Sequence, residues 1–314
     1  MSSKTPLENT PAHVPVLYHE VLQYLQPVSD GKYVDGTLGA GGHAFGILEK
    51  SSPNGELLGL DLDPTAISLA QEKLHPFGKR AHLVQTSYQN IDLEMAKVGW
   101  QDVDGILVDL GVSSMQLDTA ERGFSFQSDG PLDMRFDPTQ ERSAWHLVNQ
   151  ASQKELATLL RVFGEMPGAE RIAAAIIEAR PLDTTAELTR VINAVVKSNP
   201  RKVHPATLIF QALRITVNQE LAGIELFLPK AVASLKKGGK LAVITFHSLE
   251  DRIVKQYYRL ESRDCICPPK QPVCTCGHVA TVAILTKKSI QAAPDEMHQN
   301  SRARSARLRV IEKL

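Results

Sequence analysis

The stretch Tyr33-Val-Asp-Gly-Thr-Leu-Gly-Ala-Gly-Gly-His43 carries the strongest fold signal in this chain. A short β-prone run ends in an acid, four glycines follow, and an amphipathic helix is expected immediately afterwards. A strand that turns so tightly into a helix brings backbone N–H groups and the helix N-terminus against a bound ligand. A second apolar run, residues 57–60, ends in Asp61, where nucleoside-binding α/β folds hold ribose hydroxyls. The two features together predict a site for an adenosine-containing cofactor.

Length and composition are those of an ordinary globular protein. The 314 residues are 43% hydrophobic and 22% charged, enough for one large domain with an insertion or for two domains. The formal net charge is zero, so any contact with a polyanion must come from local basic patches. The N-terminal residues are polar, and the apolar runs fall far short of the roughly 20 residues that span a bilayer. We therefore expect a cytoplasmic protein without membrane contact.

Strand and helix patterns alternate through the first third of the chain. Apolar runs of strand length are separated by segments with apolar residues at helical spacing, as at Ile67, Ala70 and Leu74. Such alternation predicts a parallel sheet with helices on both faces. The expected strands are 32–35, 57–61, 82–86 and 105–110, and the expected helices are 14–25, 42–50 and 65–75.

The alternation stops after Asp118, where a polar loop, residues 121–137, leads into helices without strands. Ser152-Gln-Lys-Glu155 and Thr184-Thr-Ala-Glu187 have the capping-box pattern of a helix start. Gly164 is expected to end the first of these helices. About a hundred residues therefore form a helical insertion.

The sheet is expected to resume at Lys240-Leu-Ala-Val-Ile-Thr-Phe246, after a long helix. Two further strands, 279–285 and 308–311, are expected near the end of the chain, joined by a polar loop that contains Pro294. The predicted fold class is α/β, with a doubly wound, Rossmann-like sheet and an inserted helical domain. The predicted segments are 1–116 and 217–314 for the sheet domain and 117–216 for the insertion.

The glycine spacing separates several classes of nucleotide-binding protein. Gly36-x-x-Gly39-x-Gly41-Gly42 differs from the dinucleotide fingerprint G-x-G-x-x-G, which disfavours a nicotinamide enzyme. Two β candidates after the fifth strand suit the terminal hairpin of S-adenosylmethionine-dependent methyltransferases better than half of a dehydrogenase. A structural turn that holds no ligand is the remaining alternative.

Asp109 ends the fourth predicted strand and is followed by Leu-Gly-Val-Ser-Ser114. Open α/β sheets bind ligands at the carboxyl ends of their strands, so this side chain is expected to face the reactive end of the cofactor. A carboxylate there can accept a hydrogen bond from an amino group of the cofactor or substrate. The alternative is an aspartate that caps the next turn.

Seven short motifs follow one another along the chain. They are Asp35-Gly-Thr-Leu-Gly-Ala-Gly-Gly-His43, Asp109-Leu-Gly-Val-Ser-Ser114, Glu121-Arg-Gly-Phe-Ser-Phe126, Asp129-Gly-Pro-Leu-Asp-Met-Arg135, His204-Pro-Ala-Thr207, Phe210-Gln-Ala-Leu-Arg214 and Phe246-His-Ser-Leu-Glu-Asp-Arg252. From about His13 to the C-terminus, the sequence resembles the bacterial ribosomal RNA small subunit methyltransferase H family. The resemblance implies an S-adenosylmethionine-dependent enzyme that methylates N4 of a cytidine in the decoding region of 16S rRNA. The implied partner is 16S rRNA within the small ribosomal subunit.

The cofactor contacts of that family carry over onto residues near the predicted strand ends. Glycines let the backbone approach, Asp61 suits ribose hydroxyls, Tyr88 suits an adenine face, and Gln116 would orient the methionine end. Tyr88 is also compatible with an ordinary core aromatic. The family commonly has an arginine after its His-Pro-Ala-Thr motif, whereas this chain has leucine and isoleucine at 208–209. The implied cofactor-binding residues are Gly41, Gly42, His43, Asp61, Tyr88, Asp109 and Gln116.

Methyl transfer to a cytosine amine depends on how the base is positioned and on where the released proton goes. The N4 lone pair is delocalised into the ring, so a hydrogen-bond acceptor on its protons favours a more pyramidal and nucleophilic amine. We expect Asp109 or a neighbouring backbone carbonyl to supply that acceptor. His247, after the fifth strand, is the candidate proton acceptor, and a structural histidine bonded to the following turn is the alternative.

RNA contacts are expected from the helical insertion, its 121–137 loop and local basic clusters. An enzyme that acts on a base edge must bring an unpaired or splayed base into a pocket. Each cluster is also open to the simpler interpretation of solvated surface charge. A non-catalytic RNA-binding or ribosome-assembly factor is the competing function. The basic clusters are Arg201-Lys202, Lys287-Lys288 and the group Arg302, Arg304, Arg307 and Arg309.

All four cysteines of the chain lie in one segment, residues 265–276. The thiolates of Cys265, Cys267, Cys274 and Cys276, spaced C-x-C-x6-C-x-C, could close tetrahedrally on a structural zinc ion. The usual zinc spacing is C-x2-C, so reduced cysteines in a proline-stiffened loop are the slightly favoured alternative. Such tight clustering does not indicate the disulfide framework of a secreted fold.

Overall fold

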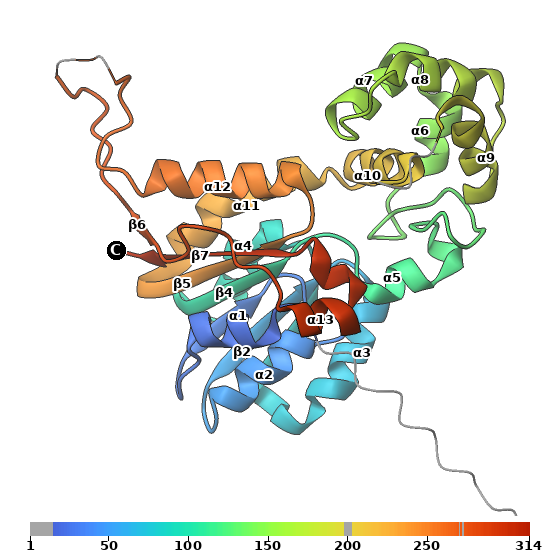
Figure 1. The fold of residues 1–314 in the computed structure, drawn as a ribbon. Coiled ribbons are helices and arrows are strands. Elements are labelled where there is room, and N and C mark those ends of the chain that lie inside the picture. Colours follow the sequence, from blue (N-terminus) through green and yellow to red (C-terminus); the bar gives the residue numbers. More distant parts are fainter. Residues whose placement is uncertain (1–14, 198–202, 270, 272) are drawn as a thin grey trace, which may run out of the picture.

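A seven-stranded sheet forms the centre of the molecule (Figure 1). The computed structural model describes residues 15–197, 203–269, 271 and 273–314. The strands are β1 (Lys32–Asp35), β2 (Glu56–Asp61), β3 (Ala81–Gln85), β4 (Val103–Asp109), β5 (Leu235–Thr245), β6 (Val282–Ile284) and β7 (Arg307–Lys313). Their order is β3-β2-β1-β4-β5-β7-β6. The first five strands run parallel, and β7 is antiparallel to both of its neighbours.

The predicted α/β alternation is confirmed, because the first four strands begin within two residues of their expected positions. Their near-continuous apolar runs reflect burial on both faces of a parallel sheet. Ile106, Leu107 and Val108 of β4, for example, are each completely buried. The pair of strands after β5 is also present, and it closes the sheet with an antiparallel hairpin-like edge.

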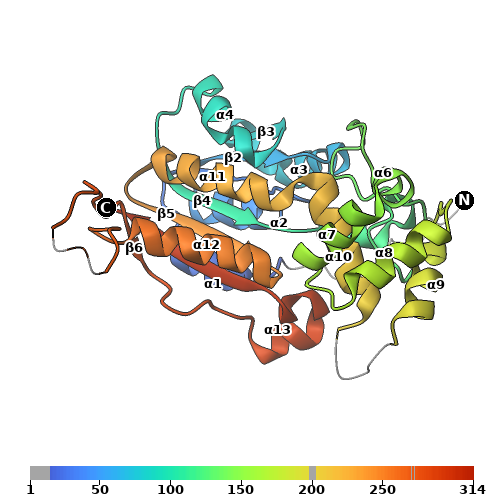
Figure 2. The same cartoon turned by 90° about the horizontal axis from the view of Figure 1, so that it is seen from above.

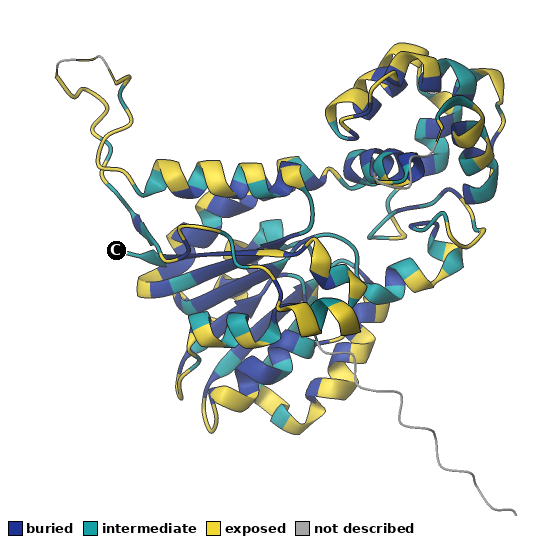
Figure 3. Cartoon of the chain, viewed as in Figure 1, coloured by how far each residue is buried: buried dark blue, intermediate teal, exposed yellow. Residues whose placement is uncertain are grey.

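Helices cover both faces of the sheet and bury two apolar cores against it (Figures 2 and 3). The covering helices are α1 (Tyr18–Leu25), α2 (Gly42–Lys50), α3 (Pro64–Leu74), α4 (Ile91–Lys97), α11 (Glu220–Ser234) and α12 (Ser248–Glu261). The first three pack on one face, and the last three pack on the other. Successive residues of β1 show the alternation, since Tyr33 joins one core and Val34 joins the other.

Five further helices lie beside the sheet and share an apolar core of their own (Figure 1). They are α6 (Ala144–Gln150), α7 (Gln153–Val162), α8 (Ala169–Glu178), α9 (Thr185–Val195) and α10 (Pro205–Asn218). We call residues 120–218 the helical region. Both predicted capping boxes are present, at Ser152 and at Thr184. The predicted end of this helix is confirmed, because α7 ends at Val162 with Phe163 as its C-cap, and Gly164 follows directly.

The C-terminal part of the chain departs from prediction in two elements. The strand expected at 279–285 is reduced to β6, whose three residues pair with β7. Pro294 does not lie in a loop but begins a short helix, α13 (Pro294–Gln299). Proline suits the first helical position, because its fixed φ matches the helix and its missing N–H would have no partner there.

Two expectations concern the limits of the described chain. The basic pair Arg201-Lys202 lies outside the described residues. Among the helices that are described, we find none of sufficient length and apolar character to cross a membrane.

Candidate active site

A cavity of about 670 Å³ opens at the carboxyl edge of the parallel strands. Each of the five parallel strands contributes a lining residue at its end or directly after it. This is the edge at which open α/β sheets bind their ligands. Residues 110–116, which follow β4 and enter α5 (Ser114–Asp118), form another part of the wall. The lining residues at the strand ends are Gly36, Asp61, Thr86, Asp109 and Phe246.

The glycine turn between β1 and α2 reaches the cavity with its backbone. Gly39 and Gly41 have φ values of +52° and +76°, which L-residues with side chains rarely adopt. A Cβ on Gly42 would lie 2.4 Å from Cγ of Pro15, so the close approach also requires glycine. Gly42 lines the cavity, and Gly41 serves as the left-handed residue from which α2 begins.

Asp61 lies at the end of β2 and ties that strand to the glycine turn. Its Oδ2 accepts a hydrogen bond of 2.8 Å from the Gly39 N–H, and its Oδ1 accepts one of 2.9 Å from Asp63. Burial raises the pKa of Asp61 above its usual value, although these two N–H donors oppose the rise. Each carboxylate oxygen keeps a further lone pair for a hydroxyl donor. The predicted position facing ribose hydroxyls therefore has the chemistry that role needs.

Asp109, at the end of β4, has a buried carboxyl oxygen without a hydrogen-bond partner, as do His43 and Glu250 at their own polar atoms in the described part of the chain. Its backbone N–H donates a 2.6 Å hydrogen bond to the Thr37 hydroxyl, but its carboxyl Oδ1 is buried without a partner among the described residues. Burial, followed by the charges of Asp35 and Glu250, raises its pKa well above the usual value. An unpartnered carboxyl oxygen at this point favours a ligand that brings a donor or a positive charge.

Two neighbouring groups complete the electrostatics around Asp109. Asp35 ends β1 and is 1% exposed, and burial raises its pKa to about 7. His43 stands in the first turn of α2, where burial lowers its pKa to about 4, so the imidazole is neutral at pH 7. Its Nε2 lies 4.0 Å from Oδ2 of Asp109. The edge thus holds several acids and no positively charged histidine, an arrangement that favours a cationic ligand.

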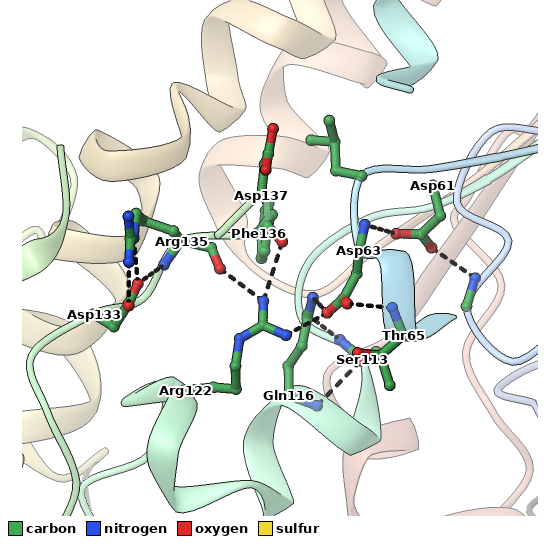
Figure 4. A network of polar contacts seen from close by, with 12 residues as sticks. Asp61, Asp63, Thr65, Ser113, Gln116, Arg122, Asp133, Arg135, Phe136 and Asp137 are labelled. Carbon is green, nitrogen blue, oxygen red and sulfur yellow. Dashed lines mark hydrogen bonds and ion pairs between the residues drawn. The ribbon is translucent and has the colours of Figure 1, made fainter. Parts of the chain in front are cut away.

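Gln116 is held in a network that joins the sheet to the helical region (Figure 4). Its Nε2 donates to Oδ2 of Asp63 at 3.0 Å, and its Oε1 accepts from the Ser113 N–H at 3.1 Å. Arg122 binds the same Oδ2 of Asp63 at 2.5 Å and donates to the carbonyls of Arg135 and Phe136. Gln116 therefore lines the cavity with an amide that is already fixed by its neighbours.

The network also explains how the predicted 121–137 loop reaches the site. Arg122 fixes the backbone at Phe136, and the Phe136 side chain lines the cavity. The pKa of Asp63 lies below its usual value, because the hydrogen bonds from Gln116 and Arg122 and the Arg122 charge outweigh the opposing effect of burial. Asp63 is thus an ionised anchor between the sheet edge and the helical region.

Tyr88 lines the cavity and is also packed as a core aromatic. Its ring lines the cavity after β3, and it also packs edge-on against Phe227 of α11 with 5.0 Å between ring centroids. Burial raises the pKa of its hydroxyl, so the phenol stays neutral. An aromatic ring fixed in this way can present one face to a bound heterocycle.

His247 is held by helix α12 and does not line the cavity. Its Nδ1 accepts a 3.4 Å hydrogen bond from the Glu250 N–H, and its Nε2 lies 3.1 Å from the Glu250 carboxylate. Of the two interpretations of this histidine, the structure has the geometry of the second, a side chain bonded to the following turn. Since His247 does not line the cavity, its side chain is not placed to accept a proton there.

Sequence reasoning missed a buried charged group next to His247. Arg214 of α10 donates two hydrogen bonds, of 2.8 and 2.9 Å, to the Glu220 carboxylate of α11. Glu220 and Glu250 both line the cavity. The two glutamates and His247 bring ligand atoms within 4.8 Å of one another, a spacing that could hold a metal. The Arg214 guanidinium already neutralises one of them, which favours an ion-pair cluster instead.

The four arginines of the predicted basic group near the C-terminus differ in exposure and in their partners. Arg304 and Arg307 are exposed, as a contact with a polyanion requires. Arg309 is instead 8% exposed and makes two hydrogen bonds, of 2.7 and 3.0 Å, to Asp251, so the prediction of a free surface charge is wrong there. Arg302 lines the cavity and pairs with Asp118 at 2.9 Å. Its neighbour α13 is packed beside it at this end of the sheet.

Sequence comparison identifies the family. The model of the MraW methylase family matches residues 10–314. The chain belongs to the MraW methylase family. A ribosomal RNA small subunit methyltransferase H from Nitratidesulfovibrio vulgaris strain Miyazaki F is 49% identical over 96% of this chain and 86% of its own. One of the same description from Heliobacterium modesticaldum is 48% identical, over 96% and 98% of the two chains.

A solved structure also aligns with the chain, at a much greater distance. An rRNA methylase from Streptococcus thermophilus covers 96% of this chain and 99% of its own, with a TM-score of 0.45 and 11% identity. So weak a likeness adds nothing to the family assignment, which rests on the sequence relatives.

This chain is an S-adenosylmethionine-dependent methyltransferase, in keeping with its membership of a methylase family. The residues of the cavity fit that cofactor, which carries a sulfonium, an ammonium and ribose hydroxyls. Asp109 offers a buried unpartnered oxygen, and Asp61 offers free lone pairs. A positive charge beside Asp35 and Asp109 would lower their raised pKa values and stabilise the ionised forms.

Proposed function

We propose that this protein methylates N4 of a cytidine in the decoding region of 16S rRNA, with the small ribosomal subunit as its substrate. The sequence relatives named as small subunit methyltransferases support the choice of RNA. The ordered motifs from Asp35 to Arg252 support the choice of the cytidine amine. The competing function, a non-catalytic RNA-binding or assembly factor, does not fit a chain that belongs to a methylase family.

The unpartnered Oδ1 of Asp109 is the observation that carries this proposal. An exocyclic amine is both a hydrogen-bond donor and the group to be methylated. Accepting a hydrogen bond from N4 draws electron density toward the nitrogen and favours its pyramidal form. The amine must also lose a proton after transfer, and a carboxyl with a raised pKa holds a proton well. We therefore assign both tasks to Asp109 and none to His247.

We assign the remaining cavity residues to binding and orienting the cofactor. The bound cofactor supplies an activated methyl group on a sulfonium, so the protein needs no nucleophile of its own. We assign Asp61 to the ribose hydroxyls, Tyr88 to the heterocycle, and the acids around Asp109 to the positive charges. Gly41 and Gly42 allow the backbone to approach, and the neutral imidazole of His43 adds no charge that would repel a cation. Gln116 donates a hydrogen bond to Asp63, and we assign it to holding the cavity wall in place.

We assign the helical region, which reaches the cavity through Phe136, to the RNA side of the cavity. A target base must leave its stack to reach an enclosed amine-binding group. The chain has no net charge, so phosphate contacts must come from exposed local residues. Lys287, Lys288, Arg304 and Arg307 are exposed and are available for that role.

The proposal is tested on small subunits from a strain that lacks the modification. The protein and S-adenosylmethionine are incubated with these subunits or with bare 16S rRNA, and the nucleosides are identified by mass spectrometry. We expect N4-methylcytidine, formed preferentially on the subunits. The matched variants are Asp109→Asn, at the last residue of β4, and Asp102→Asn, at the residue before β4 begins. Methylation at another atom, or RNA binding without any methylation, would contradict the proposal.

A further inference from the structure

The four cysteines lie in a loop that projects between α12 and β6. Figures 1 and 2 show this loop at the end of the molecule opposite the helical region. Among the described residues, the loop forms no helix or strand between Glu261 and Val282. We propose that Cys265, Cys267, Cys274 and Cys276 bind one structural zinc ion.

The sulfur positions match a tetrahedral site. The four Sγ atoms lie within 4.8 Å of one another. Cys274 lies 3.5 Å from Cys265, 3.5 Å from Cys276 and 4.0 Å from Cys267, and Cys276 lies 3.9 Å from Cys265. Zinc–sulfur bonds of about 2.3 Å place the sulfurs of a tetrahedron about 3.8 Å apart. The observed separations surround that value, and all four thiols are free.

Apolar packing does not explain why the cysteines converge. The large apolar residues of the loop face solvent, with Ile266, Val273 and Val279 exposed by 40%, 71% and 68% (Figure 3). Three of the four cysteines are exposed as well. A loop without a buried core loses conformational entropy on ordering and recovers little from apolar burial. A metal that joins its two halves supplies the missing stabilisation.

The backbone around the cysteines is arranged to support thiolate ligands. The Ile266 N–H donates to Sγ of Cys276 at 3.5 Å, which links one C-x-C pair to the other. Hydrogen bonds to a metal-bound ligand orient it and adjust its charge. Gly277, directly after Cys276, has a φ of +61°, and this left-handed turn sends the chain back toward the sheet.

The histidine after the cysteines anchors the loop and is not a fifth ligand. His278 lies 2.8 Å through Nδ1 from the Arg263 carbonyl, at the base of the loop. Thr281 N–H donates to the Glu261 carbonyl at 2.9 Å, and Ala280 N–H donates to Asp264 at 3.3 Å. The four sulfurs therefore form a set without His278, which helps to fix the base of the loop.

The donor set and the geometry select the metal and its role. Tetrahedral sites with four sulfur ligands hold zinc or iron, and zinc is the ion of closed structural sites. All four positions are taken by protein, so no open position remains for a substrate or a water. The slightly favoured prediction of reduced, unliganded cysteines rested on the C-x-C spacing, which differs from the usual C-x2-C. The two C-x-C pairs nevertheless lie close enough in the structure for their four sulfurs to surround one ion.

The test measures metal in the full-length protein, purified with reductant and without a metal-affinity step. Inductively coupled plasma mass spectrometry should find about one zinc per chain. Cys274→Ser, which removes a sulfur that lies within 4.0 Å of each of the other three, should lower the zinc content at least tenfold. Gln271→Ala is the matched control, because Gln271 bonds within the same loop but is no ligand. The control should keep its zinc.

A second measurement keeps the proposal testable if the cysteine variant fails to fold. The thiols of the unaltered protein are titrated with Ellman's reagent before and after removal of metal by a chelator. We expect slow reaction at first and rapid reaction of all four thiols afterwards. Replacement of zinc by Co²⁺ should also produce the intense visible absorption of tetrahedral cobalt–thiolate coordination. Protein without zinc whose thiols react at once, iron in place of zinc, or full zinc content in Cys274→Ser would each overturn the proposal.

Discussion

The carboxyl edge of the sheet and the helical region differ in how their buried polar groups are hydrogen-bonded. At the sheet edge, burial raises the pKa values of Asp35, Asp61 and Asp109, and one oxygen of Asp109 has no partner among the described residues. In the helical region, the buried Thr185 hydroxyl donates to a backbone carbonyl, and Thr184 exchanges hydrogen bonds with Glu187 in a capping box. The sheet edge therefore keeps buried acids whose ionised forms are unfavourable, whereas these buried polar groups of the helical region have hydrogen-bond partners.

The difference indicates what each region has been selected to do. Unfavourable polar burial persists where a ligand completes it, because the binding partner supplies the missing charge or donor. Apolar packing and satisfied caps persist where the chain only needs to hold a shape. Substitutions should therefore separate the regions: neutralising an acid at the edge should cost activity rather than stability, and trimming the helical core should do the reverse.

The largest effect is expected from Asp109→Asn. Asparagine fits the same space but cannot take a proton and offers a weaker acceptor, so methyl transfer should fall about 100-fold or more. The unaltered enzyme should lose activity as the pH falls, because protonation of Asp109 removes the acceptor, and its raised pKa moves this loss to higher pH than for an ordinary carboxyl. Single-turnover rates across pH provide the measurement. A variant with unchanged rates and the same pH profile would remove Asp109 from the chemistry.

The opposite result is expected from Leu160→Ala in α7. Leu160 is completely buried in the core of the helical region, so its truncation should lower the free energy of unfolding by about 2–5 kcal/mol. Chemical denaturation measures the loss, and calorimetric titration with S-adenosylmethionine under native conditions should show an unchanged affinity per folded chain. A large drop in that affinity would show that the two regions are not separable.

Asp35→Asn should stabilise the protein in a pH-dependent manner. The unfolded chain releases this proton near pKa 3.8, whereas the folded chain holds it to about 7, so stability from the protonated acid is lost as the pH rises between these values. Asparagine keeps the neutral form, and its advantage should grow across this interval to at most about 4 kcal/mol above pH 7. Denaturation at pH 5 and pH 8 checks the sign. Equal effects at both pH values would rule out the buried acid as the cause.

The smallest effect is expected at a helix cap. Thr184→Ala removes the hydroxyl that accepts from the Glu187 N–H at 3.3 Å, which should cost about 1 kcal/mol of stability. Thr184→Ser keeps the hydroxyl and is the control. Methyl transfer by either variant at 25 °C should match that of the unaltered enzyme. Reduced activity in Thr184→Ala alone would connect this helix to the site more closely than our comparison allows.

Sequence alone was sufficient for the parts of the site that depend on local pattern. The glycine turn, Asp61 and Asp109 are marked by strand ends and spacing, and all of them reach one cavity. The pairing of Asp63 with Arg122 joins residues 59 positions apart, and no local pattern announces it. Whether a charged residue is free or paired also depends on the fold, as Arg309 shows.

Two further differences have the same physical origin. His247 has the residue type of a proton acceptor, but helix α12 uses its ring as a cap, which only the position of Glu250 determines. The spacing of the cysteines departs from common zinc motifs, yet the loop brings their sulfurs together. In both cases the sequence identifies a capable side chain, and the three-dimensional surroundings decide its partner.

The most direct test is a crystal structure with S-adenosylhomocysteine, the demethylated product. We expect density in the cavity beside the glycine turn, with the ribose hydroxyls on the Asp61 carboxylate and the sulfur end toward Asp109. The same density at any other place on the molecule, with the Asp109 oxygen still unpartnered, would contradict this expectation.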